Sequence, residues 1–219
     1  MIFEDRRHAG RLLADAVLER LGPPGAGERR VVLGLPRGGV PVAAVVAEAL
    51  DAPLDVLVVR KLGAPGHEEY AIGAIASGGA KTVDEAAVVR LGIDAATLAD
   101  LEARERAELG ARERRFGADG ERPDVRGATV VVVDDGVATG ATMRAALAAL
   151  RRRGPARVVV AIPLAPADTL ARLRREADAV VCLEAPDPFH AVGQGYAAFP
   201  QVSDDAVARL LADARRERT

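Results

Sequence analysis

Short runs of consecutive apolar residues recur along the chain, separated by longer stretches of mixed apolar and polar positions. Each run is about five or six residues long with few polar residues, which is typical of a strand buried on both faces of a parallel sheet. The pattern predicts five such strands, at residues 30–35, 54–59, 129–133, 158–162 and 179–183.

The stretches between these runs favour helices. Apolar residues three or four positions apart, as at Leu13, Val17 and Leu21, form the stripe of an amphipathic helix. Asp94 and Ser203 stand where their side chains would cap the first turn of a helix. Helices are predicted at residues 4–21, 41–50, 93–116, 168–176 and 203–216, with a further one ending near residue 153.

Strands that alternate with helices predict an α/β fold with a doubly wound, mostly parallel five-stranded sheet flanked by helices. A length of 219 residues suits one such domain, so we expect a single domain over 1–219 with its core at about 28–184. Residues 185–202 have no regular period and predict a small C-terminal hood beside the terminal helices. The charged helix at 93–116 is expected to be solvated, with a dimer contact as the alternative.

Composition narrows the range of partners and compartments. The formal net charge of −2 gives no basic surface to attract nucleic acid or an anionic membrane. The one cysteine, Cys182, excludes an internal disulfide and fits a reducing compartment. No run approaches the roughly 18 apolar residues of a membrane-spanning helix, and the charged N-terminus does not suit a signal peptide. We therefore expect a cytoplasmic protein with no nucleic-acid or membrane partner.

Residues 130–143, VVVVDDGVATGATM, bring together groups that suit a sugar phosphate. The valines predict a buried strand ending at Asp134 and Asp135, and paired carboxylates accept hydrogen bonds from ribose hydroxyls. Side chains alternate along a strand, but a turn at Gly136 could direct both carboxylates to one ligand. Residues 138–142 would present N–H groups and two hydroxyls at a helix N-terminus, where phosphate binds. An ordinary strand end with threonine caps is the alternative.

This order of four apolar residues, two acids and A-T-G-x-T resembles the signature with which type I phosphoribosyltransferases bind 5-phosphoribosyl-1-pyrophosphate (PRPP). Outside the motif, the resemblance is closest to an uncharacterised branch of that family with no settled acceptor. The resemblance implies that Asp134 and Asp135 hold the ribose and reach a Mg²⁺ cofactor through ribose or water. It also implies PRPP contacts along the loop, at Gly136, Val137, Ala138, Thr139, Gly140, Ala141 and Thr142.

PRGG at residues 36–39 follows the first predicted strand. Taken alone it is a common turn. In the family that the chain resembles, such a loop takes the pyrophosphate, with Arg37 supplying charge. Gly38 and Gly39 would let the backbone approach the ligand closely and adopt an unusual peptide geometry.

Residues 60–79, RKLGAPGHEEYAIGAIASGG, have little to bury and resemble the mobile loop that closes over PRPP in this family. Closure would exclude water from a reactive sugar. We expect Arg60 and Lys61 to contact the pyrophosphate; two solvated charges at a strand end are the alternative. Glu68 and Glu69 are candidates for removing a proton from the acceptor; the alternative is that the reaction needs no base from the protein. Part of the segment, residues 70–76, could instead form a strand.

The hood is the expected place for the acceptor. Phe189, Tyr196 or Phe199 could stack on a ring, with Pro163 at a nearby strand end, although the aromatic side chains could instead fill a small core of the hood. Ala138 stands where some purine enzymes of the family carry an aspartate base. Residues 161–166 lack the lysine that 6-oxopurine enzymes use there. Both departures argue against hypoxanthine or guanine as the acceptor.

These features predict an Mg²⁺-dependent phosphoribosyltransferase that moves the 5-phosphoribosyl group of PRPP to a nitrogenous base or similar acceptor and releases pyrophosphate. The resemblance also implies a homodimer. The main alternative is a non-catalytic regulator that keeps the same fold and senses PRPP or nucleotides. A sugar-phosphate hydrolase on the same scaffold is a third possibility.

Overall fold

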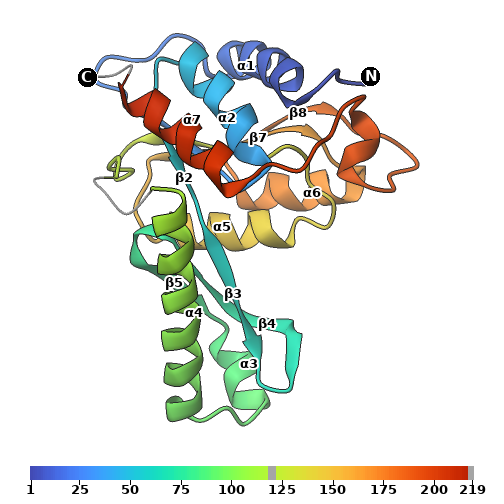
Figure 1. The fold of residues 1–219 in the computed structure, drawn as a ribbon. Helices are drawn as coiled ribbons and strands as arrows, with labels where there is room; N and C mark the ends of the chain where they lie inside the picture. Colours follow the sequence, from blue (N-terminus) through green and yellow to red (C-terminus); the bar gives the residue numbers. More distant parts are fainter. Residues whose placement is uncertain (118–121, 217–219) are drawn as a thin grey trace.

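A five-stranded parallel sheet forms the centre of the larger of two lobes (Figure 1). The computed structural model describes residues 1–117 and 122–216, apart from the side chains of Glu68 and Glu69. All four pairings in this sheet are parallel, which confirms the predicted fold class. In spatial order the strands are β2 (Leu54–Val56), β1 (Arg30–Gly34), β6 (Thr129–Val133), β7 (Arg157–Leu164) and β8 (Ala179–Glu184).

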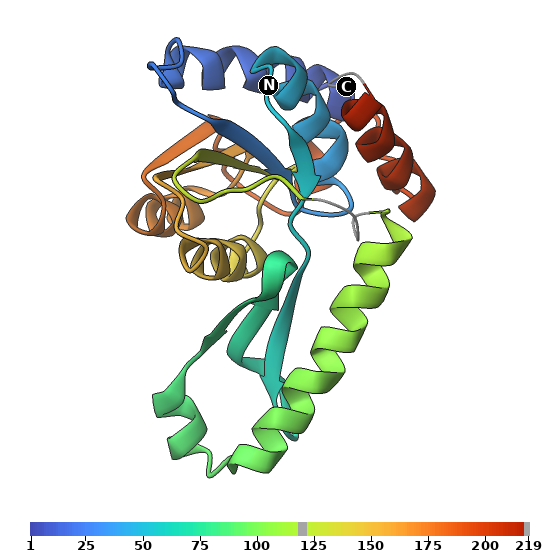
Figure 2. The same cartoon turned by 90° about the vertical axis from the view of Figure 1, so that its left-hand side faces the viewer.

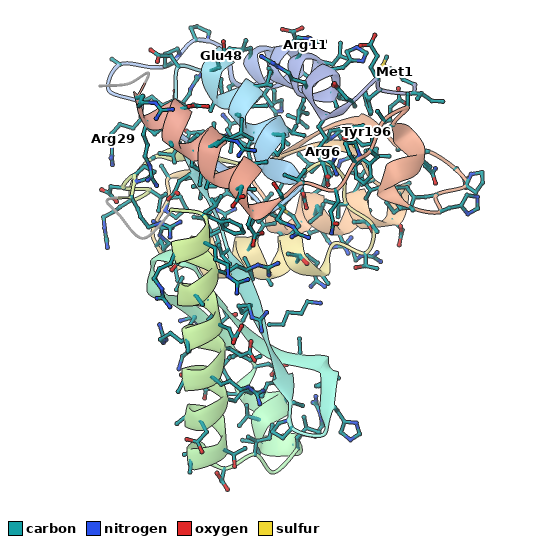
Figure 3. The ribbon with its side chains drawn as sticks, viewed as in Figure 1. Met1, Arg6, Arg11, Arg29, Glu48 and Tyr196 are labelled. Carbon is teal, nitrogen blue, oxygen red and sulfur yellow. The ribbon has the colours of Figure 1, made fainter. Side chains whose placement is uncertain are left out.

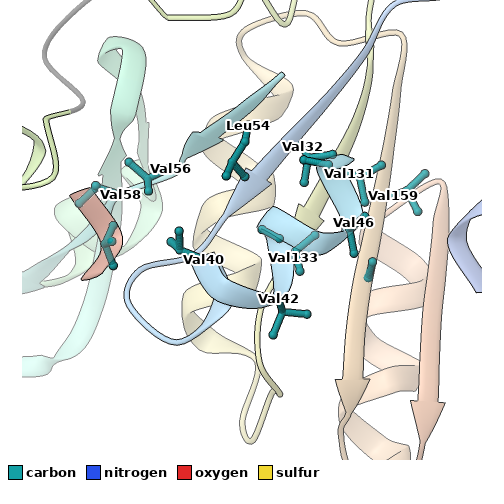
Figure 4. Close-up of a cluster of buried hydrophobic side chains, with 14 of the residues drawn as sticks. Val32, Val40, Val42, Val46, Leu54, Val56, Val58, Val131, Val133 and Val159 are labelled. Carbon is teal, nitrogen blue, oxygen red and sulfur yellow. The ribbon is translucent and has the colours of Figure 1, made fainter. Parts of the chain in front are cut away.

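Helices cover both faces of the sheet because alternate strand residues point to opposite sides. Val131 and Val133 join a buried cluster with α1 (Arg6–Leu21), α2 (Gly39–Ala49) and α7 (Asp204–Arg216). Val130 and Val132 join a second cluster with α5 (Ala141–Arg151) and α6 (Ala167–Glu176). Figure 4 shows the first cluster, where valines of β1, β2, β6 and β7 lie with Val46 of α2.

The order of the strands along the chain reverses between β1 and β6, so their connections leave in opposite directions. Such a reversal opens a crevice at the carboxyl ends of the two strands, where α/β proteins bind ligands. Gly34 pairs with Val133, and the Leu35 N–H donates to the Val133 carbonyl at 2.8 Å. The loops that follow β1 and β6 therefore start side by side.

The smaller lobe is an arm built on a separate three-stranded antiparallel sheet (Figures 1 and 2). The chain leaves β2 at Val56 and passes through Leu57 and Val58, both buried, into the arm. Ser77 fixes this passage, because its N–H donates to the Val58 carbonyl and its hydroxyl oxygen accepts from the Val58 N–H, both at 2.9 Å. The elements of the arm are β3 (Val59–Ala64), β4 (His67–Ala76), η1 (Ser77–Gly79), β5 (Ala80–Val83), α3 (Glu85–Arg90) and α4 (Ala95–Arg115).

The arm corrects two of the sequence predictions. Residues 60–79 are not an irregular loop, because β3 pairs along β4 and satisfies its backbone groups within a sheet. The alternative of a strand at residues 70–76 is confirmed, since these residues lie within β4. The predicted strand at 54–59 ends at Val56, and Val59 already belongs to β3. Many residues here are glycine or alanine, so the segment lacked the alternation that signals a strand. The charged helix was predicted correctly: Asp94 caps α4 by accepting from the Thr97 N–H at 2.7 Å.

The predicted hood lies over the end of the sheet and is held by the N-terminal residues. Phe3 donates its N–H to the Gly195 carbonyl and accepts from the Ala197 N–H, both at 2.8 Å. The hood includes the short helix η2 (Val192–Gly195), and Ser203 caps α7 as predicted, accepting from the Ala206 N–H. Within the described parts of the chain, no helix is both long enough and apolar enough to cross a membrane.

Candidate active site

The PRGG loop and the two aspartates are in direct contact at the sheet edge. A Cβ atom at Gly38 would lie 1.9 Å from Asp135 Oδ2, and one at Gly39 would lie 2.7 Å from Asp134 Cα. Neither position has room for a side chain, so both glycines are required by packing as well as by any ligand. The peptide bond between Pro36 and Arg37 is cis. The two motifs singled out in the sequence thus form one site.

The two aspartates differ in their surroundings. Asp134 Oδ1 accepts from the Asp135 N–H at 2.9 Å. Burial raises the pKa of Asp134 well above its usual range, and the charge of Asp135 adds to the effect. Asp135 Oδ2 accepts from Arg6 Nε at 2.8 Å, so its carboxylate already has a cationic partner. Asp134 is therefore the carboxylate with more capacity for a ligand.

The loop between β6 and α5 is shaped as an anion site. The Ala138 carbonyl accepts from Thr169 Oγ1 at 2.8 Å, and Gly140 has φ +78° immediately before α5. Among the described residues, no acceptor is found for the backbone N–H groups of Thr139, Gly140 and Thr142. Unpaired N–H groups at a helix N-terminus, together with the helix dipole, favour a phosphate.

The arm brings cations toward this loop. Arg60 binds Glu105 of α4, with Nη2 at 2.7 Å and Nε at 2.9 Å from Oε2. Lys61 is exposed. A hollow of about 320 Å³ separates the arm from Thr142, and it is lined by Val59, Arg60, Lys61, Gly63, Arg104, Glu105 and Thr142. The other two predicted arm residues, Glu68 and Glu69, have side chains outside the described part of the structure.

The other predicted site residues are buried or make contacts within the protein. Arg37 leans toward α7, with Nη1 at 3.4 Å from Asp204 Oδ1. Tyr196 is only 7% exposed, and its hydroxyl donates to the Asp135 carbonyl at 2.5 Å. It packs with Phe3, and Phe189 borders the same cluster, so the alternative of a small hood core describes both rings better than acceptor stacking does. Pro163 is buried in β7.

Sequence reasoning missed Arg6. This residue lies in the first turn of α1, 129 positions from the aspartate that it binds. The chain has 30 basic residues, and nothing in the pattern distinguished this arginine from its neighbours. A contact over such a separation depends on the way that the N-terminal segment crosses the hood.

The donor groups at the site fit a metal ion that binds together with substrate phosphates. In the part of the chain that the structure describes, no group of three or more His, Cys, Asp or Glu side chains is placed to hold a metal. Mg²⁺ commonly binds through one or two carboxylates together with substrate phosphates. The oxygen atoms of Asp134, beside unpaired N–H groups suited to phosphate, fit that mode of binding.

Comparison with known proteins identifies close relatives of the whole chain. Residues 4–198 match the family described as phosphoribosyl transferase domain. Two Mycobacterium tuberculosis proteins, one of them named "Putative phosphoribosyl transferase Rv0571c", are 47% identical over 216 residues. The match covers 99% of this chain and 48% of each relative, so the chain spans about half the length of these curated relatives.

Solved structures agree with this relationship. The crystal structure of TT1426 from Thermus thermophilus is 46% identical, with a TM-score of 0.86 over 97% of this chain and 99% of that one. The AQ2163 protein of Aquifex aeolicus is 14% identical, with a TM-score of 0.51 over 86% of this chain and 78% of that one. At that identity the likeness extends to the fold alone.

Proposed function

Since the chain belongs to the family of proteins with a phosphoribosyl transferase domain, we propose that it transfers the 5-phosphoribosyl group of PRPP to a nitrogenous base and releases pyrophosphate. One observation carries the proposal: the loops after β1 and β6 meet at the strand-order reversal, with Gly38 and Gly39 packed on Asp134 and Asp135. This contact supports a role for Asp134 in binding the ribose diol, beside two backbone regions suited to phosphate.

The donor would lie across the two loops. Thr139, Gly140 and Thr142 offer N–H groups to the 5′-phosphate. Asp134 accepts hydrogen bonds from the ribose hydroxyls, and the backbone at Gly38 and Gly39 approaches the pyrophosphate. Mg²⁺, when bound, would neutralise charge on the pyrophosphate oxygens. The site would act mainly by positioning the sugar and stabilising the leaving group.

In the reaction, the bond between the anomeric carbon and the pyrophosphate oxygen breaks as a bond from that carbon to the base nitrogen forms. The leaving oxygen carries away the electron pair, and the nitrogen loses its proton. Arg60 and Lys61 of the arm would stabilise the leaving pyrophosphate, since both line the hollow opposite Thr142. Glu68 or Glu69 would take the proton, and approach of the arm would exclude water.

The acceptor is proposed to be other than a 6-oxopurine. Ala138 offers no carboxylate in the phosphate loop, and residues 161–166 carry no lysine. With Tyr196 and Pro163 buried, Phe189 and Phe199 are the more accessible of the four residues predicted to lie at the acceptor.

The test is pyrophosphate release from PRPP and Mg²⁺ by the full chain, measured with a panel of purine, pyrimidine and pyridine bases. Release that depends on one base supports the proposal. Asp134→Asn, which keeps the shape of the side chain but not its charge, should abolish release and weaken PRPP binding. Tight nucleotide binding without release from any base would overturn the enzymatic proposal in favour of a regulator. Base-independent release, as hydrolysis, would overturn it as well.

A further inference from the structure

Arg6 joins three segments that are far apart in the sequence. Its Nε donates to Asp135 Oδ2 at 2.8 Å, and its Nη1 donates to the Pro200 carbonyl at 2.7 Å. The guanidinium carbon lies 3.8 Å above the centre of the Phe199 ring. Figure 3 shows Arg6 beside Tyr196, where the start of α1 meets the hood. The side chain thus connects α1, the end of the hood and the loop after β6.

The Asp135 carboxylate is enclosed on several sides. The arginine holds one oxygen atom, and the backbone of Gly38 leaves no room for even a Cβ atom next to it. On the backbone side, the Asp135 carbonyl accepts from the Tyr196 hydroxyl. The side chains of Arg6 and Asp135 are only 10% and 13% exposed. The Asp135 carboxylate is thus already engaged in a largely buried ion pair, and it is less accessible to a ribose than the carboxylate of Asp134.

We propose that Arg6 is a positioning residue of the PRPP site, which acts by fixing Asp135. In this arrangement the adjacent aspartates have different tasks: Asp134 receives the ribose, and Asp135 anchors the donor loop to α1 and to the hood. The inference rests on the proposed function and deepens it. It also gives the hood a second purpose, because Phe199 and Pro200 hold the arginine that holds the donor loop.

Arginine suits this position for reasons of geometry. Its planar fork donates in two directions at once, and its flat face stacks on an aromatic ring. Lysine would keep the charge near Asp135 but could not make the three contacts together. Glutamine would lose the charge and leave a buried carboxylate without a cation. The two substitutions therefore separate charge from geometry.

The experiment compares Arg6→Gln and Arg6→Lys with Arg7→Gln, a matched control on an exposed neighbour. The kcat and KM for PRPP are measured at saturating acceptor, using only variants that thermal unfolding shows to be folded. We expect Arg6→Gln to raise KM for PRPP by about tenfold or more with a smaller change in kcat, because an unpaired buried charge displaces the loop. Arg6→Lys should recover part of the loss, and Arg7→Gln should match the unmodified protein.

A double-mutant cycle with Asp135→Asn then tests whether Arg6 acts through that aspartate. The effect of Arg6→Gln on PRPP affinity should largely disappear in the Asp135→Asn background, since coupled residues are non-additive. Additive effects, or an Arg6→Gln variant that matches Arg7→Gln, would overturn this inference while leaving the proposed function in place. An unmodified protein that neither binds nor uses PRPP would instead overturn the proposed function, and this inference with it.

Discussion

The core and the arm contribute to the same site by different means. In the core, the site residues follow β1 and β6, two neighbouring strands whose ten residues are all buried. Their register and close contacts leave the loops few alternatives. In the arm, Arg60 and Lys61 lie on a three-stranded sheet away from the main core, and Arg60 is held by an ion pair with Glu105.

We therefore expect the core to hold its part of the site rigidly and the arm to be more adjustable. Packing fixes backbone groups and carboxylates in the core, where a change of about one methyl group is felt. Partly exposed ion pairs are weaker and depend on salt. We therefore expect substitutions in the core, and at its joint with the arm, to have larger effects than substitutions of the cations on the arm.

The largest effect is expected at the joint between the two regions. Arg122 Nε donates to Asp55 Oδ2 of β2 at 2.8 Å, and its Nη1 pairs with Glu113 of α4. Asp55 is 2% exposed, and its Oδ1 has no hydrogen-bond partner among the described residues. Arg122→Gln would leave this buried carboxylate poorly compensated, at a cost of about 3–5 kcal/mol in the free energy of unfolding. Urea unfolding at neutral pH measures the loss.

A pH series makes this test more specific. Burial raises the pKa of Asp55, and the charge of Arg122 opposes that rise. Without the arginine the pKa rises further, so protonation at lower pH removes the buried charge and recovers part of the lost stability. Arg106→Gln on the exposed face of α4 is the control. A loss at Arg122 no greater than at Arg106 would contradict the idea that this ion pair joins core and arm.

The second effect is expected inside the core. In Gly39→Ala the new Cβ would meet the Val133 carbonyl oxygen and Asp134 Cα, both at 2.7 Å, and neither belongs to a side chain that can turn away. We expect a loss of about 1–3 kcal/mol in stability and weaker PRPP binding, because the donor loop must shift. Calorimetric titration with PRPP and urea unfolding measure the two losses.

Gly25→Ala is the matched control for that substitution, because its Cβ would come no closer than 3.9 Å to Glu28 Oε2. Equal effects at the two glycines would show that the contact between the loops is not tight.

The contrast between core and arm also explains which parts of the fold could be predicted from the sequence. Four consecutive valines at 130–133 have one plausible place, a buried central strand, so the sheet and the residues at its end were predictable. The motif at 134–142 could be recognised as well, because its residues are contiguous in the sequence. In the arm, the sequence predicts a strand at residues 70–76 only as an alternative to a loop, because β4 has glycine and alanine where a clear pattern would need large apolar residues.

Contacts between segments far apart in the sequence were the other feature that could not be predicted. The sequence showed that Tyr196 and Asp135 were candidates for chemistry but not that the tyrosine hydroxyl donates to the aspartate carbonyl. Nothing local marked Arg6 as their neighbour. The division of tasks between Asp134 and Asp135 depends on these contacts, so it could be inferred only from the folded chain.

A smaller effect is expected from the arm. Lys61 is exposed, and no ion pair involving it occurs among the residues described. Lys61→Gln should therefore weaken PRPP binding by about 1 kcal/mol, about fivefold in Kd, without changing stability. The loss should shrink as salt is added. The chain's only other lysine, Lys81, pairs with Glu102 and serves as the control, since Lys81→Gln should leave PRPP affinity unchanged.

The smallest effect is expected when one ion pair of the core is compared with one ion pair of the arm. Glu28 pairs with Arg30 at the start of β1, and the hydrogen bond from Arg30, followed by that from the Gly25 N–H, lowers the pKa of Glu28 from 4.5 to about 2. A lowered carboxyl pKa stabilises the folded state above the unfolded value and stops doing so as pH falls from about 4.5 toward 2. Glu28→Gln should therefore cost up to about 1 kcal/mol at pH 7, after allowance for solvent screening, and nothing near pH 2.

Glu102→Gln is the counterpart in the arm, where Lys81 is 41% exposed and Arg30 in the core pair is only 6% exposed. Screening by water should keep the loss from Glu102→Gln to a few tenths of a kcal/mol. Urea unfolding of both variants between pH 7 and pH 2 measures the difference. If core pairs are held more firmly than arm pairs, the loss at pH 7 is larger for Glu28→Gln; equal losses would mean that the two regions differ in their backbone packing and not in their surface electrostatics.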